Sequence, residues 1–128
     1  MLPARHRLRT AADFSAVVRG AGAVRSGGRF VVVHARYATT PDAADRPGPR
    51  VGFVVSKAVG GAVVRNRTKR VLRHLVAARL GRIPAGCDLV VRANPAAADA
   101  TTPQLADDLE RGLTAVLGRL AAPAGVPS

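Results

Sequence analysis

Residues 63–80 read VVRNRTKRVLRHLVAARL and predict one long amphipathic helix around which the rest of the chain has to be arranged. At about 100° per residue, Val64, Val71 and Leu75 fall within a narrow arc that can be buried. The helix is expected over about 62–80 and, at about 1.5 Å per residue, is about 27 Å long, enough to follow several successive phosphates. The helix carries six cations, Arg65, Arg67, Lys69, Arg70, Arg73 and Arg79. On the side opposite the arc lie Arg65, Asn66, Lys69, Arg70 and Arg73.

No acidic residue balances these cations locally. Neither Asp nor Glu occurs between Arg46 and Cys87. A solvated surface helix, the plainest alternative, usually mixes both signs in pairs three or four residues apart. The pattern therefore favours a helix whose cationic face binds a polyanion such as RNA.

The overall charge supports the same interpretation. The 128 residues contain 20 Lys and Arg against 8 Asp and Glu, a net charge of +12, which favours a nucleic acid as partner. All but two of the cations are Arg, which can form bidentate phosphate contacts, although a GC-rich genome would also produce this bias. Residues 46–87 hold ten cations and no acid, whereas residues 88–128 hold three Arg and five acids. We expect the partner to contact the first two thirds of the chain.

Length and composition are typical of one domain over residues 1–128, with an ordered core at about 5–120 and a flexible tail at 121–128. A single cysteine, Cys87, excludes an internal disulfide and a cysteine-based zinc site, and it fits a reducing cytoplasm. No apolar run reaches the length of a membrane span, and the N-terminus lacks the apolar core of a signal peptide. The sequence predicts a cytoplasmic protein that does not bind membranes.

The remaining segments predict an α+β sandwich, a sheet of about four strands with three helices packed mainly on one face. Thr10 and Asp13 form an approximate capping box for the first helix, and Gly81 is expected to end the basic helix. Acidic residues in the first turns of the last helix are expected to favour its dipole. The expected order is helix 11–19, short strand 24–26, strand 29–37, strand 50–56, the basic helix, strand 88–93 and helix 103–120.

Catalytic motifs are nearly absent. His6, His34 and His74 lie on separate predicted elements and have no evident carboxylate partner, and Asp42 and Asp45 lie in a loop without fixed geometry. The glycines match neither a Walker loop nor a dinucleotide-binding motif. We therefore expect no catalytic residues and no metal held by the protein alone.

Residues 50–73, RVGFVVSKAVGGAVVRNRTKRVLR, resemble the signature of the bacterial ribonuclease P protein component, with Arg65-Asn66-Arg67 as the RNR core. The segments RLRTAADFSAVVRGAG and DLVVRANP extend the resemblance over most of residues 5–95. This resemblance implies that the basic helix joins two parallel strands by a left-handed crossover, against the general right-handed rule.

The resemblance also implies a function. Ribonuclease P is an endoribonuclease that removes the 5′ leader of precursor tRNA, its RNA subunit holds the catalytic magnesium ions, and the protein is an accessory subunit. The implied partners are the catalytic RNA and precursor tRNA, with no DNA and no membrane. By position, the residues that would contact the catalytic RNA are Arg65, Asn66, Arg67, Lys69, Arg70 and Arg73.

A second group of residues would form the cleft for the single-stranded leader. Val18 and Val33 stand where the family often has Phe and Tyr, so fewer aromatic rings are available for base stacking. Ala58 and Gly61 likewise replace a common Lys and Asn. The expected cleft residues are Phe14, Val18, Val33 and Lys57, and further basic contacts are expected from Arg5, Arg7 and Arg9.

Two alternatives belong to other functional classes. Small basic α+β domains also occur among structural RNA-binding proteins of the ribosome. A DNA-binding repressor would need a helix-turn-helix, but the predicted strands flank the basic helix on both sides.

Overall fold

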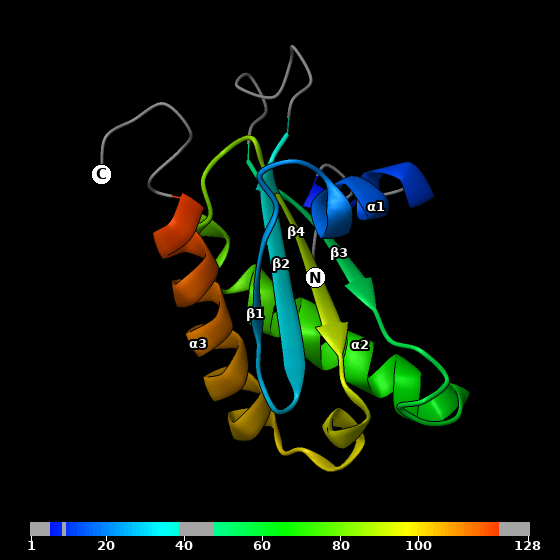
Figure 1. Cartoon of the computed structure of the whole chain (residues 1–128). Helices are drawn as coiled ribbons and strands as arrows, with labels where there is room; N and C mark the ends of the chain where they lie inside the picture. Colours follow the sequence, from blue (N-terminus) through cyan, green and yellow to red (C-terminus); the bar gives the residue numbers. More distant parts are fainter. Residues whose placement is uncertain (1–5, 9, 39–47, 121–128) are drawn as a thin grey trace.

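The computed structural model describes residues 6–8, 10–38 and 48–120, and Figure 1 shows the arrangement of its helices and strands. The predicted tail at 121–128, the loop residues Asp42 and Asp45, and the candidate residues Arg5 and Arg9 lie outside the described residues. No helix in the part that is described is both long enough and apolar enough to cross a membrane.

Helix α1, Ala11–Arg19, begins and ends where the sequence predicted. The hydroxyl of Thr10 accepts a hydrogen bond from the backbone N–H of Asp13, and the Asp13 carboxylate accepts one from the N–H of Thr10. This reciprocal capping box satisfies two of the free N–H groups at the start of the helix. The predicted box is therefore confirmed.

Four strands form a mixed sheet in the order β1-β2-β4-β3, where β1 is Val24–Gly27, β2 is Val31–Tyr37, β3 is Arg50–Val54 and β4 is Cys87–Ala93. Strand β2 is antiparallel to β1 and β4, whereas β3 and β4 are parallel and are joined through helix α2, Ala62–Ala77. In Figure 1, β3 and β4 run downward with β4 to the left, and α2 passes behind them, which makes the crossover left-handed. The α+β class and the element order agree with the prediction.

The helices occupy both faces of the sheet. Helix α3, Thr102–Leu120, and α2 pack on one face, where Leu72, Leu89 and Leu109 are fully buried. Helix α1 lies on the opposite face, over a smaller cluster that contains Val17 and Val90. The expectation of helices mainly on one face thus holds for two of the three, and the α1 face remains partly open.

Helix α2 ends earlier than predicted, at Ala77 rather than near Gly81, and a short 3-10 turn, Leu80–Arg82, follows it. The guanidinium of Arg79 donates to the backbone oxygen of Leu75 and to the carboxylate of Glu110 on α3. These contacts turn the chain toward α3 and end the helix at Ala77. The earlier end could not be predicted from the sequence, because it depends on tertiary contacts and not on a local helix-breaking residue. The segment between β4 and α3 also contains a 3-10 turn, Pro95–Asp99, where the sequence suggested only a connection.

Two acidic residues of α3 have roles other than the expected interaction with the helix dipole. The buried carboxylate of Asp108 accepts hydrogen bonds from the backbone N–H groups of Phe30, at 2.8 Å, and Val31, at 2.9 Å. Glu110 binds the guanidinium groups of Arg79 and Arg82. Both acids therefore hold α3 to other elements.

Candidate nucleic-acid interface

The sequence of α2 separates a buried stripe from a cationic face. Thr68, Leu72, Leu75 and Val76 are buried against the sheet and α3, so the stripe is centred near Leu72. Val64 and Val71, which the sequence placed at its centre, are only partly buried. Arg65 consequently lies beside the stripe, is half-buried, and has an Nε atom without a hydrogen-bond partner in the described structure.

The outward face of α2 forms an open groove of about 730 Å³. Five of the six predicted RNA-binding residues line it, namely Asn66, Arg67, Lys69, Arg70 and Arg73. Val63, which is 84% exposed, and His74 complete the lining. Neither of these two residues was predicted to belong to the interface, although Val63 lies four residues before Arg67 and His74 four residues after Arg70, a spacing that places each pair on one face of the helix.

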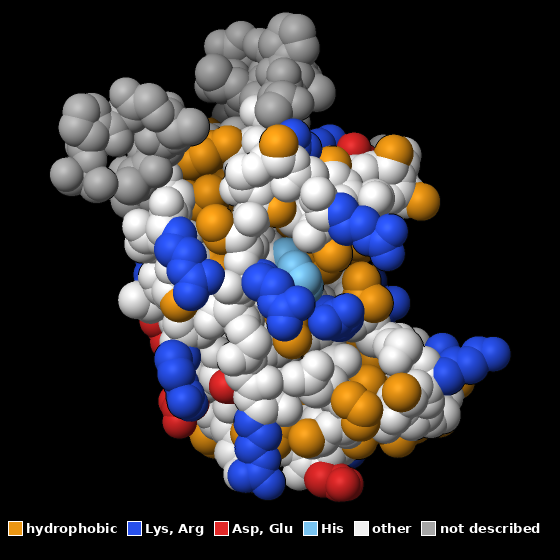
Figure 2. Space-filling view, in the orientation of Figure 1, with side chains coloured by type: hydrophobic (Ala, Val, Ile, Leu, Met, Phe, Trp, Pro, Cys, Tyr) orange, Lys and Arg blue, Asp and Glu red, His pale blue; other side chains and the backbone are white. Residues whose placement is uncertain are grey.

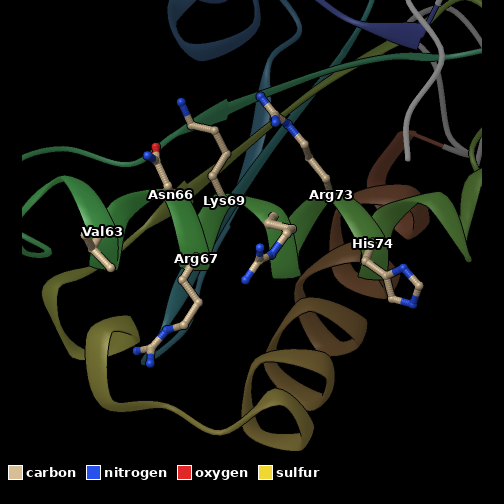
Figure 3. A pocket seen from close by; sticks show the side chains of 7 residues that line it. Val63, Asn66, Arg67, Lys69, Arg73 and His74 are labelled. Atoms are coloured by element: carbon tan, nitrogen blue, oxygen red, sulfur yellow. The ribbon is translucent and has the colours of Figure 1, made fainter.

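The groove contains two rows of side chains. Figure 3 shows Asn66, Lys69 and Arg73 extending to one side of α2, and Arg67 and His74 extending to the other. In the second row, Nη2 of Arg67 donates to the backbone oxygen of Ala98 at 3.0 Å, which ties this cation to the 3-10 turn after β4.

Charge at the groove is uncompensated within the described residues, because no cation from Arg65 to Arg73 forms an ion pair there. Nearby acids bind elsewhere: Asp88 pairs with Arg50, and Glu110 with Arg79 and Arg82. Glu110 has a lowered pKa because it accepts hydrogen bonds from Arg82 and then Arg79, so it stays ionised in these pairs. The groove is thus a concentrated positive surface suited to successive phosphates.

A second hollow lies on the α1 face of the sheet, around Phe14. Its ring lies over Gly52 of β3, where a Cβ would overlap the ring, and it packs beside Leu8 and Val17. One cavity of about 110 Å³ is lined by Phe14, Arg7, Leu8, Val51, Gly52, Phe53, Lys69 and Arg73. A neighbouring cavity of about 360 Å³ is lined by Phe14, Ser15, Val18, Arg19 and Val54. We call these two cavities together the Phe14 cleft.

The structure brings only some of the predicted leader-binding residues together. Phe14 and Val18 line the Phe14 cleft, whereas Lys57 is exposed in the turn after β3 and does not line it. Arg7, which was predicted only as a further basic contact, also lines the cleft. The prediction for Val33 is wrong, because Val33 is fully buried and faces α3, where a Cβ on Gly112 would lie 2.8 Å from its Cγ2. Alternate residues of a strand point to opposite faces, so on β2 it is His34 that shares a face with α1.

Groups suited to metal binding or nucleophilic chemistry do not gather in the described part of the chain. No set of three His, Cys, Asp or Glu residues there could hold a metal ion. Cys87 is buried, and this burial raises the pKa of its thiol to about 12, which leaves it unreactive at neutral pH. The described residues thus combine concentrated positive charge on α2 with neither a cluster of metal ligands nor an activated thiol.

Known proteins share both the sequence and the fold. The family model described as Ribonuclease P matches residues 2–117. The ribonuclease P protein component of Acidothermus cellulolyticus is 55% identical over 94% of this chain and 92% of that protein, and that of Streptomyces bikiniensis is 53% identical over 92% of this chain and 97% of its own length. The solved ribonuclease P protein of Staphylococcus aureus superposes with a TM-score of 0.74 at 30% identity, covering 87% of this chain and 94% of that one.

These similarities extend over nearly the whole chain and include the elements that form the α2 groove and the Phe14 cleft. They decide against a ribosomal protein and against a DNA-binding repressor, two functions that the composition alone did not exclude. The chain belongs to the bacterial ribonuclease P protein family, the protein subunit of the endoribonuclease complex that processes the 5′ leader of tRNA precursors.

Proposed function

We propose that the α2 groove binds the catalytic RNA of ribonuclease P while the Phe14 cleft binds the single-stranded 5′ leader of precursor tRNA. One observation carries this proposal: Lys69 and Arg73 line both the groove and the cleft. A protein that holds the catalytic RNA on α2 would therefore hold the leader within reach of the same two cations.

The two rows of the groove suit different contacts. Arg70 is exposed and can grip phosphate, and the amide of Asn66 can both donate to and accept from a sugar or base edge. Arg67 has one guanidinium nitrogen bound to Ala98, which orients the remaining donors outward. Arg65 is half-buried and would contribute a phosphate contact from the edge of the buried stripe. Exposed Val63 supplies an apolar contact at the start of the helix.

The Phe14 cleft suits a single strand because it combines the partly exposed ring of Phe14 with cations on both sides. Phe14 is half-buried and can offer part of its ring to a base, and stacking of this kind contributes about 1–3 kcal/mol. Arg7 and Arg19 line the cleft and can follow the leader backbone together with Lys69 and Arg73. Lys57, in the turn after β3, would contact the leader only outside this cleft.

Catalysis in this proposal belongs to the RNA subunit. Hydrolysis of a phosphodiester at neutral pH requires an activated water, which the magnesium ions of the RNA would provide, and the protein would position the substrate. The proposed partners are thus the catalytic RNA and precursor tRNA, in the cytoplasm where tRNA matures.

The direct test is cleavage of precursor tRNA by the cognate RNA subunit at low magnesium, with and without the protein. We expect the protein to restore accurate leader removal that the RNA alone performs poorly under these conditions. The protein without the RNA should leave the precursor intact. Accurate leader removal by the isolated chain, or no effect of the protein on the RNA-catalysed reaction, would contradict the proposal.

A further inference from the structure

Three side chains from adjacent strands meet on the α1 face of the sheet, outside the Phe14 cleft. His34 on β2 is the register partner of Arg25 on β1. Arg92 on β4 is the partner of Val32, two residues before His34, and so points to the same face. Figure 2 shows a histidine among Lys and Arg side chains on this face of the molecule.

His34 is an unusual member of this group because it is 3% exposed and its Nε2 atom has no hydrogen-bond partner among the described residues. A buried polar atom without a hydrogen-bond partner is unfavourable, because it has lost its contacts with water and gained none in the protein. Burial first, and then the charges of Arg92 and Arg25, lower the pKa of the imidazole, so it is neutral at physiological pH. Arg25 and Arg92 themselves are exposed.

The group also continues the Phe14 cleft. Arg92 is the register partner of Val54 on β3, and Val54 lines the larger cavity of the cleft together with Phe14 and Val18. A strand of RNA that passes Phe14 and Val54 would therefore reach Arg92 next, followed by His34 and Arg25 toward the β1 edge.

We propose that Arg25, His34 and Arg92 form a second RNA subsite, which binds a phosphodiester of the leader beyond the nucleotide at Phe14. Two exposed guanidinium groups would neutralise the phosphate charge, and the Nε2–H tautomer of His34 would donate to a phosphate or ribose oxygen. The ligand would thus supply the hydrogen-bond partner that the protein does not. The subsite rests on the proposed leader-binding function and extends it to longer leaders.

The test uses holoenzyme reconstituted with its RNA subunit and precursors whose leaders increase in length. Arg25→Met and Arg92→Met remove the proposed phosphate contacts, and Arg111→Met is the matched control because Arg111 is an exposed cation on α3. We expect the wild-type affinity to rise with leader length, and each subsite variant to lose the part of this gain that comes from the longer leaders. Each should also lower the salt slope for long-leader precursors by about 0.7 units, the value for one contact to a single strand.

His34 is tested separately. His34→Gln keeps a donor and should retain binding of long leaders, whereas His34→Leu should lose it while melting at or above the wild-type temperature. If the subsite variants behave like Arg111→Met at every leader length, the proposed subsite is wrong, but leader binding in the Phe14 cleft is not contradicted. Equal losses for short and long leaders would also overturn it, since they indicate a structural role. A wild-type enzyme indifferent to leader length would instead overturn the proposed leader binding itself.

Discussion

The backbone N–H of Phe30 donates to the carboxylate of Asp108, which lies 78 residues further along the chain, over 2.8 Å. The same carboxylate oxygen accepts from the N–H of Val31, and a Cβ on Gly28 would overlap the carboxylate. The last helix thus supports the turn between β1 and β2 through one buried acid. A glycine at position 28 provides the space for this contact.

Replacing Asp108 by Ala should therefore destabilise the fold. Two buried backbone donors would lose their acceptor, and hydrogen bonds to a charged group contribute about 1.5–3 kcal/mol each, so we expect a loss of about 3–6 kcal/mol in the free energy of unfolding. Urea denaturation measures this loss. Asp107→Ala is the control, since Asp107 is exposed and its replacement should change stability by less than about 0.5 kcal/mol. Equal midpoints for the two variants would contradict the assigned role.

The sequence predicts the elements well because their signals are local. The capping box at Thr10 and Asp13 marks the start of α1, and β-branched residues mark the strands. Contacts between distant residues could not be read in this way: Asp108 and Glu110 resemble dipole-stabilising acids until α3 is seen to pack against the β1–β2 turn and the end of α2. The hand of the crossover likewise came from resemblance, since the general rule predicts the opposite.

The candidate site was only partly predictable for a similar reason. Helical spacing identifies the α2 face, because any exposed helix presents its residues in that order. The leader-cleft residues were transferred by sequence position, which left the phase of β2 undetermined and placed Val33 on the α1 face of the sheet, a face to which His34 points instead. A shift of one residue along a strand moves a side chain to the other face of the sheet. The pairing of β2 with β1 and β4 settles this phase.

Arg70 lies on α2 and Arg79 just beyond its end, and the two should differ in their effect on RNA binding. Arg70 is exposed in the groove without an ion pair in the described structure, so Arg70→Ala should lower the slope of log affinity against log salt by about one unit and leave stability unchanged. Arg79 is paired with Glu110, so Arg79→Ala should reduce stability and leave the slope nearly unchanged. Binding to the catalytic RNA at several salt concentrations distinguishes the two. A slope that falls equally in both variants would show that charge alone, independent of position, determines binding.

The ion pairs of Glu110 should make the free energy of unfolding depend on pH in the acidic range. Its pKa is lowered by hydrogen bonds from Arg82 and Arg79, so the unfolded chain takes up a proton before the folded one as the pH falls. The stabilisation is therefore complete above the ordinary pKa of glutamate, about 4.3, and disappears as the pH falls through the lower value in the folded state. Glu110→Gln should be less stable than wild type at neutral pH, with a difference that shrinks in acid. The effect is small because these groups are partly exposed and screened by solvent. A difference that is constant from neutral to acidic pH would rule out the ion pairs as its source.

Phe14 tests whether the cleft binds bases, because its ring is both part of the cluster beneath α1 and part of the cleft lining. Phe14→Ala should lower stability and weaken leader binding together, which cannot separate the two roles. Phe14→Leu retains apolar volume against Gly52 but removes the aromatic face, so it should cost less than about 1.5 kcal/mol of stability. We expect it nevertheless to lose about 1–3 kcal/mol of the preference for precursor over mature tRNA, as measured with the holoenzyme. Val17→Ala is the control for core packing, since Val17 is fully buried in the same cluster and should lower the melting temperature without changing that preference. If Phe14→Leu keeps the full preference for precursor, the ring is only a packing element and the leader must be held by the cations around it.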